Sequence, residues 1–471
     1  MTRRALVVAA LLPLVLAAGC RSFDPAEARR EQTEAFRETL RNRLEALPER
    51  ALSLEDCVRV ALTNNAAVRE ADLNRVLAGL GQTAAFSAFL PRVAAGVGYT
   101  DRDYDNLLGM TSGGQLAFGP QEDTVGTLTV GLPVFAPSTW FLWAAARHGH
   151  AAAGIAADYV RQAIVLRTTA AYCDVLSQRD TVRALESQAD AAAKLADRVG
   201  GLAAEGYAAD WERGQADLQA LARRTELDSA RRRLRVLEAD LLAAMGLPPE
   251  AEIELSGDCA GPQMPEGTVE ELVLRALETH PRLAIADRLV VMNEHQVRRA
   301  FCAFLPTLSV RATHAWGGEG LVADAVGWST GFQGAWTLFS GFANSAAYRA
   351  AKTGLRRTET EREEAFLSVI VGVLAAEAQV RDAREAVAVR RMAADVAVAK
   401  AADRADRAAE GLLPVSDALD ARAEADFAQV ALIRSRYQET VAVAALELAM
   451  GIVRAPGDAE QTEPEPEGEA E

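Results

Sequence analysis

Hydrophobic and polar positions along the chain follow the same order twice. Residues 54–91 and residues 269–306 align without a gap, and both segments end on Phe-Leu-Pro. A second pair of segments aligns from Glu205 and from Glu410, where each begins with Glu-Gly and runs on to Ala-Met-Gly. Internal repeats constrain an architecture strongly. The chain is therefore predicted to contain two similar halves, each with a helix, short strands and two very long helices.

Four segments alternate between apolar and small polar residues, which predicts β-strands with one apolar face. The segments are 91–100, 124–134, 307–316 and 328–338. Their apolar faces contain Val93, Ala95, Val97, Tyr99, Leu128, Val130, Leu132, Leu308, Val310, Ala312, His314, Trp316, Trp328, Thr330, Phe332, Trp336 and Leu338. The connections 101–123 and 317–327 are expected to be external loops.

The length of these strands suits a membrane, because a tilted strand of about ten residues can cross a bilayer. Tyr99, Trp316, Trp328 and Trp336 are expected to form an aromatic girdle at the membrane interface. Two small soluble hairpins with buried aromatic residues are the alternative. Four strands cannot close a barrel, and an open sheet edge is not tolerated in lipid. Spanning strands would therefore have to be shared among several chains.

The long helices are predicted from proline-free stretches with helical spacing of apolar residues. The first half has Ala151–Leu202 and Asp210–Met245, and the second half has Ala346–Ala409 and Ser416–Met450. A helix as long as the first would measure roughly 78 Å. Ser416 is expected to cap the last helix through its hydroxyl group. A soluble helical bundle or coiled coil is the alternative.

The first residues have the pattern of an export signal. Arg3 and Arg4 precede an apolar run that is too short for a spanning helix. The run ends in Leu16-Ala17-Ala18-Gly19-Cys20, which resembles the lipobox of bacterial lipoproteins. The resemblance implies cleavage before Cys20 and acylation of that residue; an ordinary signal peptide is the alternative. The other cysteines, Cys57, Cys173, Cys259 and Cys302, are expected to be buried apolar residues, with one disulfide as the alternative.

Composition and charge narrow the function. The net charge is −16, and no segment concentrates positive charge as nucleic-acid binding would require. We find no enzyme, cofactor or metal motif: His148 and His150 are an isolated pair, and no Gly-rich phosphate loop follows a strand.

The expected organisation follows the repeats. It consists of a signal peptide (1–19), a lipidated extension (20–53), a first repeat (54–248, with a hairpin at 91–135 and long helices at 151–246), a linker (249–268), a second repeat (269–453, with a hairpin at 306–339 and long helices at 346–450) and an acidic disordered tail (454–471).

The sequence resembles the TolC-like outer-membrane efflux proteins, in their lipoprotein branch. The resemblance covers roughly residues 50–453 and rests on the order of several motifs. These are Leu54-Glu55 with Ala61-Leu62-Thr63-Asn64-Asn65, Ala276-Leu277-Glu278-Thr279-His280-Pro281, the two Phe-Leu-Pro entries, Leu132-Pro133-Val134-Phe135, Trp336-Thr337-Leu338-Phe339-Ser340-Gly341, and Glu410-Gly411 with Asp417-Ala418-Leu419-Asp420-Ala421. The sequence departs from its own repeat at Ala66, where the second half has Pro281, and in the first turn, which lacks a counterpart of Pro414-Val415-Ser416-Asp417.

The resemblance implies a mainly α-helical homotrimer with membrane β-strands. Twelve strands would form a β-barrel in the bacterial outer membrane, and twelve helices would continue it as an α-barrel through the periplasm, anchored by lipid at Cys20. The protein would be a passive conduit exporting small molecules, with a periplasmic adaptor (membrane fusion) protein and an inner-membrane pump, proton-driven, as partners. A channel for type I protein secretion is one alternative, and a non-conducting structural coiled-coil lipoprotein is another.

The turns at 203–211 and 408–417 are expected to lie far from the strands, at the periplasmic entrance. There they would dock the adaptor and form the gate. The candidate residues are Glu205, Gly206, Tyr207, Asp210, Glu410, Gly411, Leu412, Leu413, Pro414 and Asp417.

Overall fold

The computed structural model describes residues 24–48, 50–101, 106–109, 115–119, 122–257, 264–317, 327–410 and 412–452. The expected signal peptide, Cys20, Cys259, Gly411 and the acidic tail lie outside the described residues.

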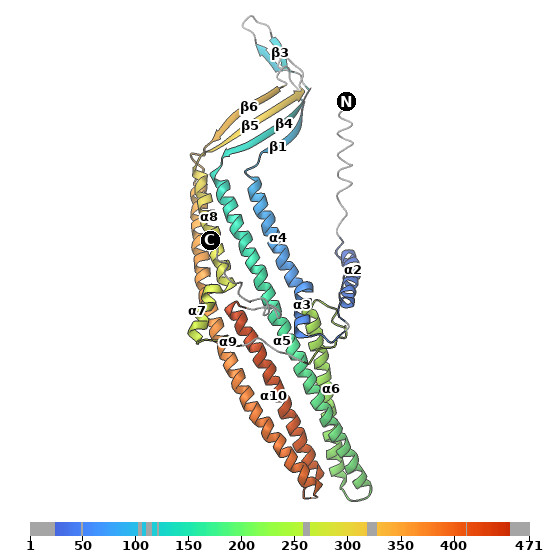
Figure 1. Ribbon diagram of the computed structural model, residues 1–471. Helices are drawn as coiled ribbons and strands as arrows, with labels where there is room; N and C mark the ends of the chain where they lie inside the picture. Colours follow the sequence, from blue (N-terminus) through green and yellow to red (C-terminus); the bar gives the residue numbers. More distant parts are fainter. Residues whose placement is uncertain are drawn as a thin grey trace, which may run out of the picture.

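The molecule is elongated, with a β-sheet at one end and long helices over the rest of its length (Figure 1). In chain order the elements are α2 (Pro25–Glu45), α3 (Leu54–Asn64), α4 (Ala66–Ser87), β1 (Arg92–Asp101), β2 (Asn106–Gly109), β3 (Gln115–Gly119), β4 (Glu122–Phe135), α5 (Pro137–Ala204), α6 (Asp210–Ala244), α7 (Val269–Thr279), α8 (Pro281–Phe301), the 3-10 turn η1 (Cys302–Phe304), β5 (Thr307–Gly317), β6 (Gly327–Ala335), α9 (Ala343–Ala409) and α10 (Val415–Met450). The prediction of a mainly helical chain with a small sheet is confirmed.

The sheet and the long helices form one continuous layer, with one level of strands and two levels of helices. Each level is four elements wide. The sheet has the order β1-β4-β5-β6. Each strand continues into one helix of the next level, where α4, α5, α8 and α9 pack side by side in that order. Below them α6 packs on α5, α5 on α10, and α10 on α9 (Figure 1). Because α5 has 68 residues and α9 has 67, these two helices alone cross both helical levels, each over about 100 Å.

Local signals explain where the shorter helices begin. Ser53 caps α3 and Thr268 caps α7, each through a reciprocal bond with an acidic residue three positions later. The sequence predicted one helix before each pair of strands, but the structure has two. Asn65 and His280 stand at the breaks with extended backbone, and each side chain caps the helix that follows.

Several helix boundaries differ from the prediction. The first long helix begins at Pro137 instead of Ala151, because proline suits the first helical turn and the aromatic run after it is helical. The prediction that Ser416 caps the last helix is wrong: the helix begins at Val415, and Pro414 is the N-cap residue. In the extension before Leu54, the helix α2 was not foreseen.

The sheet is antiparallel throughout. The two strand pairs β1–β4 and β5–β6 are joined by β4 pairing with β5, so residues from the two halves of the chain form one sheet. Two details were not predicted. β2 and β3 form a separate small pair within the expected loop 101–123, and β6 ends at Ala335, which leaves Trp336–Leu338 outside the strand.

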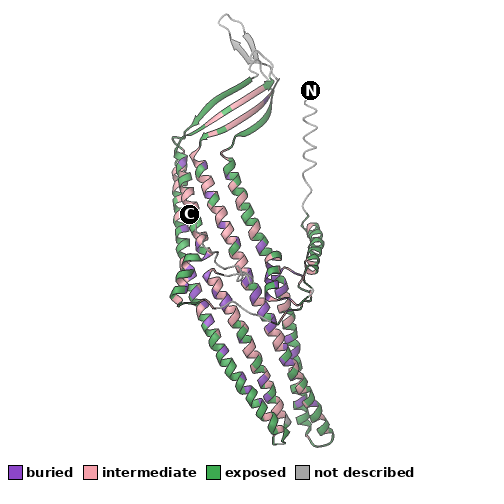
Figure 2. Ribbon diagram, in the orientation of Figure 1, coloured by how far each residue is buried: buried purple, intermediate pink, exposed green. Residues whose placement is uncertain are grey.

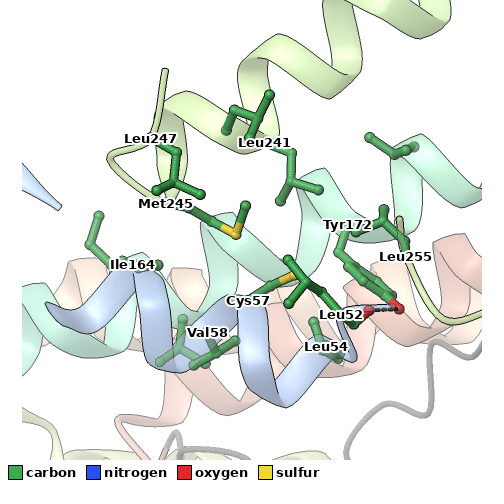
Figure 3. Close-up of a cluster of buried hydrophobic side chains, with 14 of the residues drawn as sticks. Leu52, Leu54, Cys57, Val58, Ile164, Tyr172, Leu241, Met245, Leu247 and Leu255 are labelled. Atoms are coloured by element: carbon green, nitrogen blue, oxygen red, sulfur yellow. Dashed lines mark hydrogen bonds between the residues drawn. The ribbon is translucent and has the colours of Figure 1, made fainter. Parts of the chain in front are cut away.

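The main cores lie near the middle of the helices, where most buried residues gather (Figure 2). In the first half, α3, α5 and α6 enclose Cys57, Tyr172, Leu241 and Met245 (Figure 3). In the second half, α7, α9 and α10 enclose Leu272, Val373, Leu446 and Met450, among others. Because aligned positions fill both cores, we infer that the repeat in the sequence encodes a repeated packing unit.

Candidate functional site

The four strands present one apolar face and one face of small residues. Directly opposite residues of antiparallel strands share a face. The register pairs Val93 with Val130, Val130 with Ala312, and Ala312 with Thr330. The predicted apolar faces of all four strands therefore lie on the same side of the sheet. The other side carries mainly Gly, Ala, Ser and Thr.

The apolar side is open to solvent in the single chain. The side chains of Val97 and Phe332 are 79% and 80% exposed, respectively. Soluble monomers seldom expose a contiguous apolar surface of this kind. The soluble-hairpin alternative required buried aromatic residues, and the sheet does not bury them.

The four candidate girdle residues lie at the two ends of the sheet. Tyr99, Trp316 and Trp328 belong to the end far from the helices. The indole of Trp316 covers Gly126, where a Cβ atom would lie only 2.3 Å from the ring. Trp336 lies at the helical end and donates from Nε1 to the carbonyl of Phe304 at 3.0 Å. The step of eight positions from Trp328 to Trp336 corresponds to about 26 Å of extended chain.

A second aromatic group lies where the strands meet the helices, at the same end of the sheet as Trp336. Phe89 packs edge-on against Trp140 at a ring separation of 5.1 Å, and Phe339 packs on Phe342 at 5.6 Å. All but Phe89 of these four are prominent among the exposed large apolar residues. Aromatic side chains thus border the apolar face at both ends, as a membrane interface requires.

The two lateral edges of the layer also expose apolar side chains. One edge is formed by β1, α4 and α6, and it exposes Leu73, Val76, Leu77, Leu80, Leu218, Leu221 and Val236. The other edge is formed by β6 and α9, and it exposes Leu367, Val371, Leu374, Val389, Met392 and Val396. The two edges differ in composition and in the elements that form them.

The two candidate tips lie together at the end opposite the sheet (Figure 1). At the first tip, Glu205 ends α5 and Gly206 has a φ of +81°, a conformation that favours glycine. The N–H of Tyr207 donates to the carbonyl of Leu202 at 2.8 Å, which closes the last helical turn. Tyr207 itself is 80% exposed. Asp210 is the first residue of α6.

The second tip repeats this geometry at aligned positions. Glu410 ends α9, and the N–H of Leu412 donates to the carbonyl of Arg407 at 2.9 Å. Leu412 is 67% exposed, like Tyr207 at the aligned position. Leu413 and Pro414 complete the turn. Asp417 lies in the first turn of α10, where its Oδ2 accepts from Nη1 of Arg404 at 3.5 Å.

Contacts between helices near the tips were missed by the sequence analysis. Nε2 of the buried Gln188 donates to the carbonyl of Ala423 at 3.1 Å and so ties α5 to α10, across the two halves. Lys400 pairs with Glu424 at 2.5 Å between α9 and α10. No sequence signal identifies these partners, because acidic and basic residues are abundant throughout the helices.

The structure also places the cysteines and histidines. Burial raises the pKa of Cys57 to about 12, so this thiol behaves as an apolar residue. Cys57 and Cys302 are free, whereas Cys173 is disulfide-bonded, which is the alternative given above. His148 stacks on His295 of α8 with ring centres 5.5 Å apart, and burial lowers the pKa of both. The sequence suggested that His148 and His150 are an isolated pair, but in the structure His148 contacts His295.

Within the described part of the chain, no group of three or more His, Cys, Asp or Glu residues could hold a metal ion. A cavity of about 220 Å³ lies between α5, α9 and α10, where Asp174 faces Arg434. Burial raises the pKa of Asp174 and the arginine opposes this effect.

None of the described helices is both long enough and apolar enough to cross a membrane.

Comparisons with known proteins agree on the fold. Residues 272–452 match the family described as outer membrane efflux protein. A comparison with curated proteins gave no match. The solved structure of the outer membrane protein VceC from Vibrio cholerae is similar at a TM-score of 0.70, with 16% identity over 84% of this chain and 96% of VceC. The CmeC outer membrane channel of Campylobacter jejuni has a TM-score of 0.71, with 15% identity over 84% and 85% of the two chains. The MtrE channel of Neisseria gonorrhoeae, in its open state, has a TM-score of 0.67, with 17% identity over 85% and 89%.

Proposed function

Because residues 272–452 match the outer membrane efflux protein family and the chain has the fold of solved outer-membrane channels, we propose that this protein is the outer-membrane channel of a tripartite efflux pump. It is a passive conduit that carries small molecules from the periplasm or the inner-membrane pump to the exterior. The observation that carries the proposal is a sheet with one open apolar face that continues directly into a layer of long helices.

The unfinished edges of this layer support the proposal of a homotrimer. The outer edges of β1 and β6 pair with none of the described strands, and lipid does not tolerate open edges. Because the edge formed by β1, α4 and α6 differs from the edge formed by β6 and α9, copies join head to tail and close as a ring. Three copies give a barrel of twelve strands, continued by an α-barrel of twelve helices.

The apolar side of the sheet then faces lipid and the small-residue side faces the lumen. Tyr99, Trp316 and Trp328 form one aromatic girdle, and Trp336 belongs to the other. The localisation is the bacterial outer membrane. Lipid attached to Cys20 anchors the chain, and the helices extend into the periplasm.

The tips are the periplasmic entrance. Glu205, Gly206, Tyr207 and Asp210 at the first tip, with Glu410, Gly411, Leu412, Leu413, Pro414 and Asp417 at the second, dock a periplasmic adaptor protein and form the gate. The exposed pair Tyr207 and Leu412 supports docking, because two aligned apolar side chains stand free at the end of the molecule. An inner-membrane pump, proton-driven, supplies the energy.

The test of the channel is conductance of the purified protein in planar bilayers, with the oligomer mass measured in parallel. We expect a trimer that inserts and conducts. Asp417→Ala removes the ion pair with Arg404 at the tip and serves as a second protein in this test. If both proteins are monomers or dimers that never conduct, the structural lipoprotein is favoured instead.

The test of the tips is adaptor binding. We expect the double variant Tyr207→Ser and Leu412→Ser to lower adaptor binding by roughly tenfold or more, since buried apolar anchors dominate interfaces. The matched control is Phe36→Ser, which removes an exposed aromatic side chain from α2. A bulky residue in place of Gly411 tests the same surface, and unchanged export at normal trimer levels would contradict docking there.

A further inference from the structure

A row of arginines and glycines crosses the sheet near its helical end. Arg92 lies opposite Gly131, Gly131 lies opposite Arg311, and Arg311 lies opposite Gly331. Directly opposite residues share a face, so both arginines point to the same side of the sheet. They belong to β1 and β5, which are separated only by β4, and this places their Cα atoms about 10 Å apart.

These two arginines lie on the side with small residues, away from the apolar face. Among strand residues 92–100, 124–135, 307–317 and 327–335, Arg92 and Arg311 are the only residues with a formal charge. The acidic strand residues Asp101, Glu122 and Asp123 belong to the end of the sheet far from the helices. Both are exposed, and neither forms an ion pair with any residue that the structure describes. Two cations that pair with no described acidic residue have no evident role in holding the sheet together.

The glycines beside them keep the surface open. A Cβ atom added at Gly131 or at Gly331 would meet no other atom within 4 Å. Each guanidinium group therefore has free space next to it along the row. A planar fork of N–H donors with open space beside it is suited to bidentate binding of oxyanions.

We propose that this row is an anion-binding selectivity ring, which takes solutes carrying carboxylate, phosphate or sulfate groups. The proposal rests on the trimeric channel proposed above, in which the side with small residues lines the lumen. Three copies bring six guanidinium groups to one level of the pore, at the junction between strands and helices. Rings of charged side chains set the ion selectivity of pores, and basic rings favour anions. The ring would attract anionic substrates and raise their local concentration, which opposes the repulsion by the net negative charge of the chain.

The experiment is the reversal potential of single channels across a KCl gradient, for the wild-type trimer and the double variant Arg92→Gln and Arg311→Gln. We expect the anion-to-cation permeability ratio to fall by roughly threefold or more in the variant. The matched control is Arg30→Gln with Arg37→Gln, which removes the same charge from exposed positions of α2 and leaves the ratio unchanged. Because all three channels share the same tips, a difference between them arises at the ring.

A second measurement needs no variant that might fail to fold. We expect tripolyphosphate to block the wild-type channel at low salt and to be released at 1 M KCl, where the screening length is about 3 Å. Arg92→Lys with Arg311→Lys keeps the charge, so it preserves the permeability ratio but weakens the block, since lysine lacks the bidentate fork. Conducting channels with no block, or with equal permeability ratios in all variants, would overturn the ring and leave the channel standing. Absence of conductance in every protein would overturn the channel, and the ring with it.

Discussion

The two halves of the chain solve the same structural problem with different residues. At the break between their first two helices, the first half has Asn65 and the second half has His280. Oδ1 of Asn65 accepts from the N–H of Ala67 at 2.8 Å, and Nδ1 of His280 accepts from the N–H of Arg282 at 3.0 Å. Both side chains are buried. An equivalent cap can thus be made by an amide that does not titrate or by an imidazole that does.

At the end of the last helix, by contrast, both halves have the same residue, a glycine. Gly246 and Gly451 have φ values of +68° and +72°. A Cβ atom at Gly246 would lie 2.5 Å from the carbonyl oxygen of Asn64, and one at Gly451 would lie 2.6 Å from Cδ of Pro281. In each half the end of the last helix is thereby pressed against the break of the first helix pair. The close approach, and the positive φ, both require glycine.

The halves also differ at Tyr172 of α5, whose aligned position in α9 is Glu377. The buried hydroxyl of Tyr172 donates to backbone carbonyls of Ser256 and Leu52, and so holds the linker and the segment before α3 against the core. Glu377 instead pairs with Arg381, one turn further along its own helix. Within the described residues, this hydroxyl contact belongs to the first half, whose cluster of buried residues is also the larger one.

The largest effect is expected from replacing the glycine that ends the last helix of either half. Gly246→Ala and Gly451→Ala should each lower the free energy of unfolding by about 2–4 kcal/mol, because the added Cβ meets atoms that cannot move aside and the backbone is strained. Denaturant midpoints of the detergent-solubilised protein measure this. Gly354→Ala in α9, where a Cβ meets nothing, is the control and should be neutral or slightly stabilising. Equal midpoints for all three variants would refute the close approach.

The next effect concerns the titratable cap. Burial lowers the pKa of His280 from 6.5 to about 4. Above pH 6.5 the imidazole of His280 is neutral in both the folded and the unfolded chain. Below pH 6.5 the imidazole binds a proton in the unfolded chain, whereas the folded chain excludes that proton. The free energy of unfolding should therefore fall as the pH drops from 6.5 towards 4, by about 3 kcal/mol at most.

The variant His280→Asn copies the residue of the first half and isolates this term. Its stability should depend less on pH between 6.5 and 4 than that of the wild type. Since every other titratable group is shared, the difference between the two stability–pH curves belongs to His280. Parallel curves for both proteins would show that the imidazole does not titrate in this way.

A smaller effect is expected at Tyr172, whose hydroxyl holds the linker against the first core. Tyr172→Phe removes the hydroxyl donor and should cost about 1–2 kcal/mol, which is the usual loss for a buried hydrogen bond. It should also expose the linker to limited proteolysis near Ser256, because the hydroxyl holds that segment. Glu377→Gln is the matched change in the second half and should leave proteolysis near Ser256 as in the wild type. Cleavage that is equal in both variants would contradict the asymmetry.

The smallest effect is expected at the tip. Arg404 pairs with Asp417, while the position aligned with Arg404 in the first half is Val199 and carries no charge. Both partners of the pair are partly exposed, so Arg404→Gln should change the free energy of unfolding by about 0.5 kcal/mol or less. Chemical denaturation at low and high salt measures this. A loss of several kcal/mol would mean that the pair is part of a larger network between the tips.

Much of the candidate site could be predicted from the sequence because it depends on periodicity. Alternation gave the four strands and their apolar faces, and proline-free Ala-rich stretches gave the four long helices and the two turns between them. The predictions failed where a boundary depends on one residue. Pro414, not Ser416, is the N-cap of α10, and Pro137 begins α5 well before Ala151, because proline fixes φ at the start of a helix while a serine caps only if the chain leaves it at the right position.

The sequence alone determined what recurs at short range: the repeat, the spacing of apolar residues, and the caps in which donor and acceptor lie a few residues apart. Only the tertiary structure decided which distant segments meet. It joined β4 to β5 across the two halves, placed Arg92 and Arg311 in one row, and brought Gln188 to the carbonyl of Ala423. The physical reason is that a face or a helix needs only local pattern, whereas register and partnership depend on packing between elements that are separated by hundreds of residues.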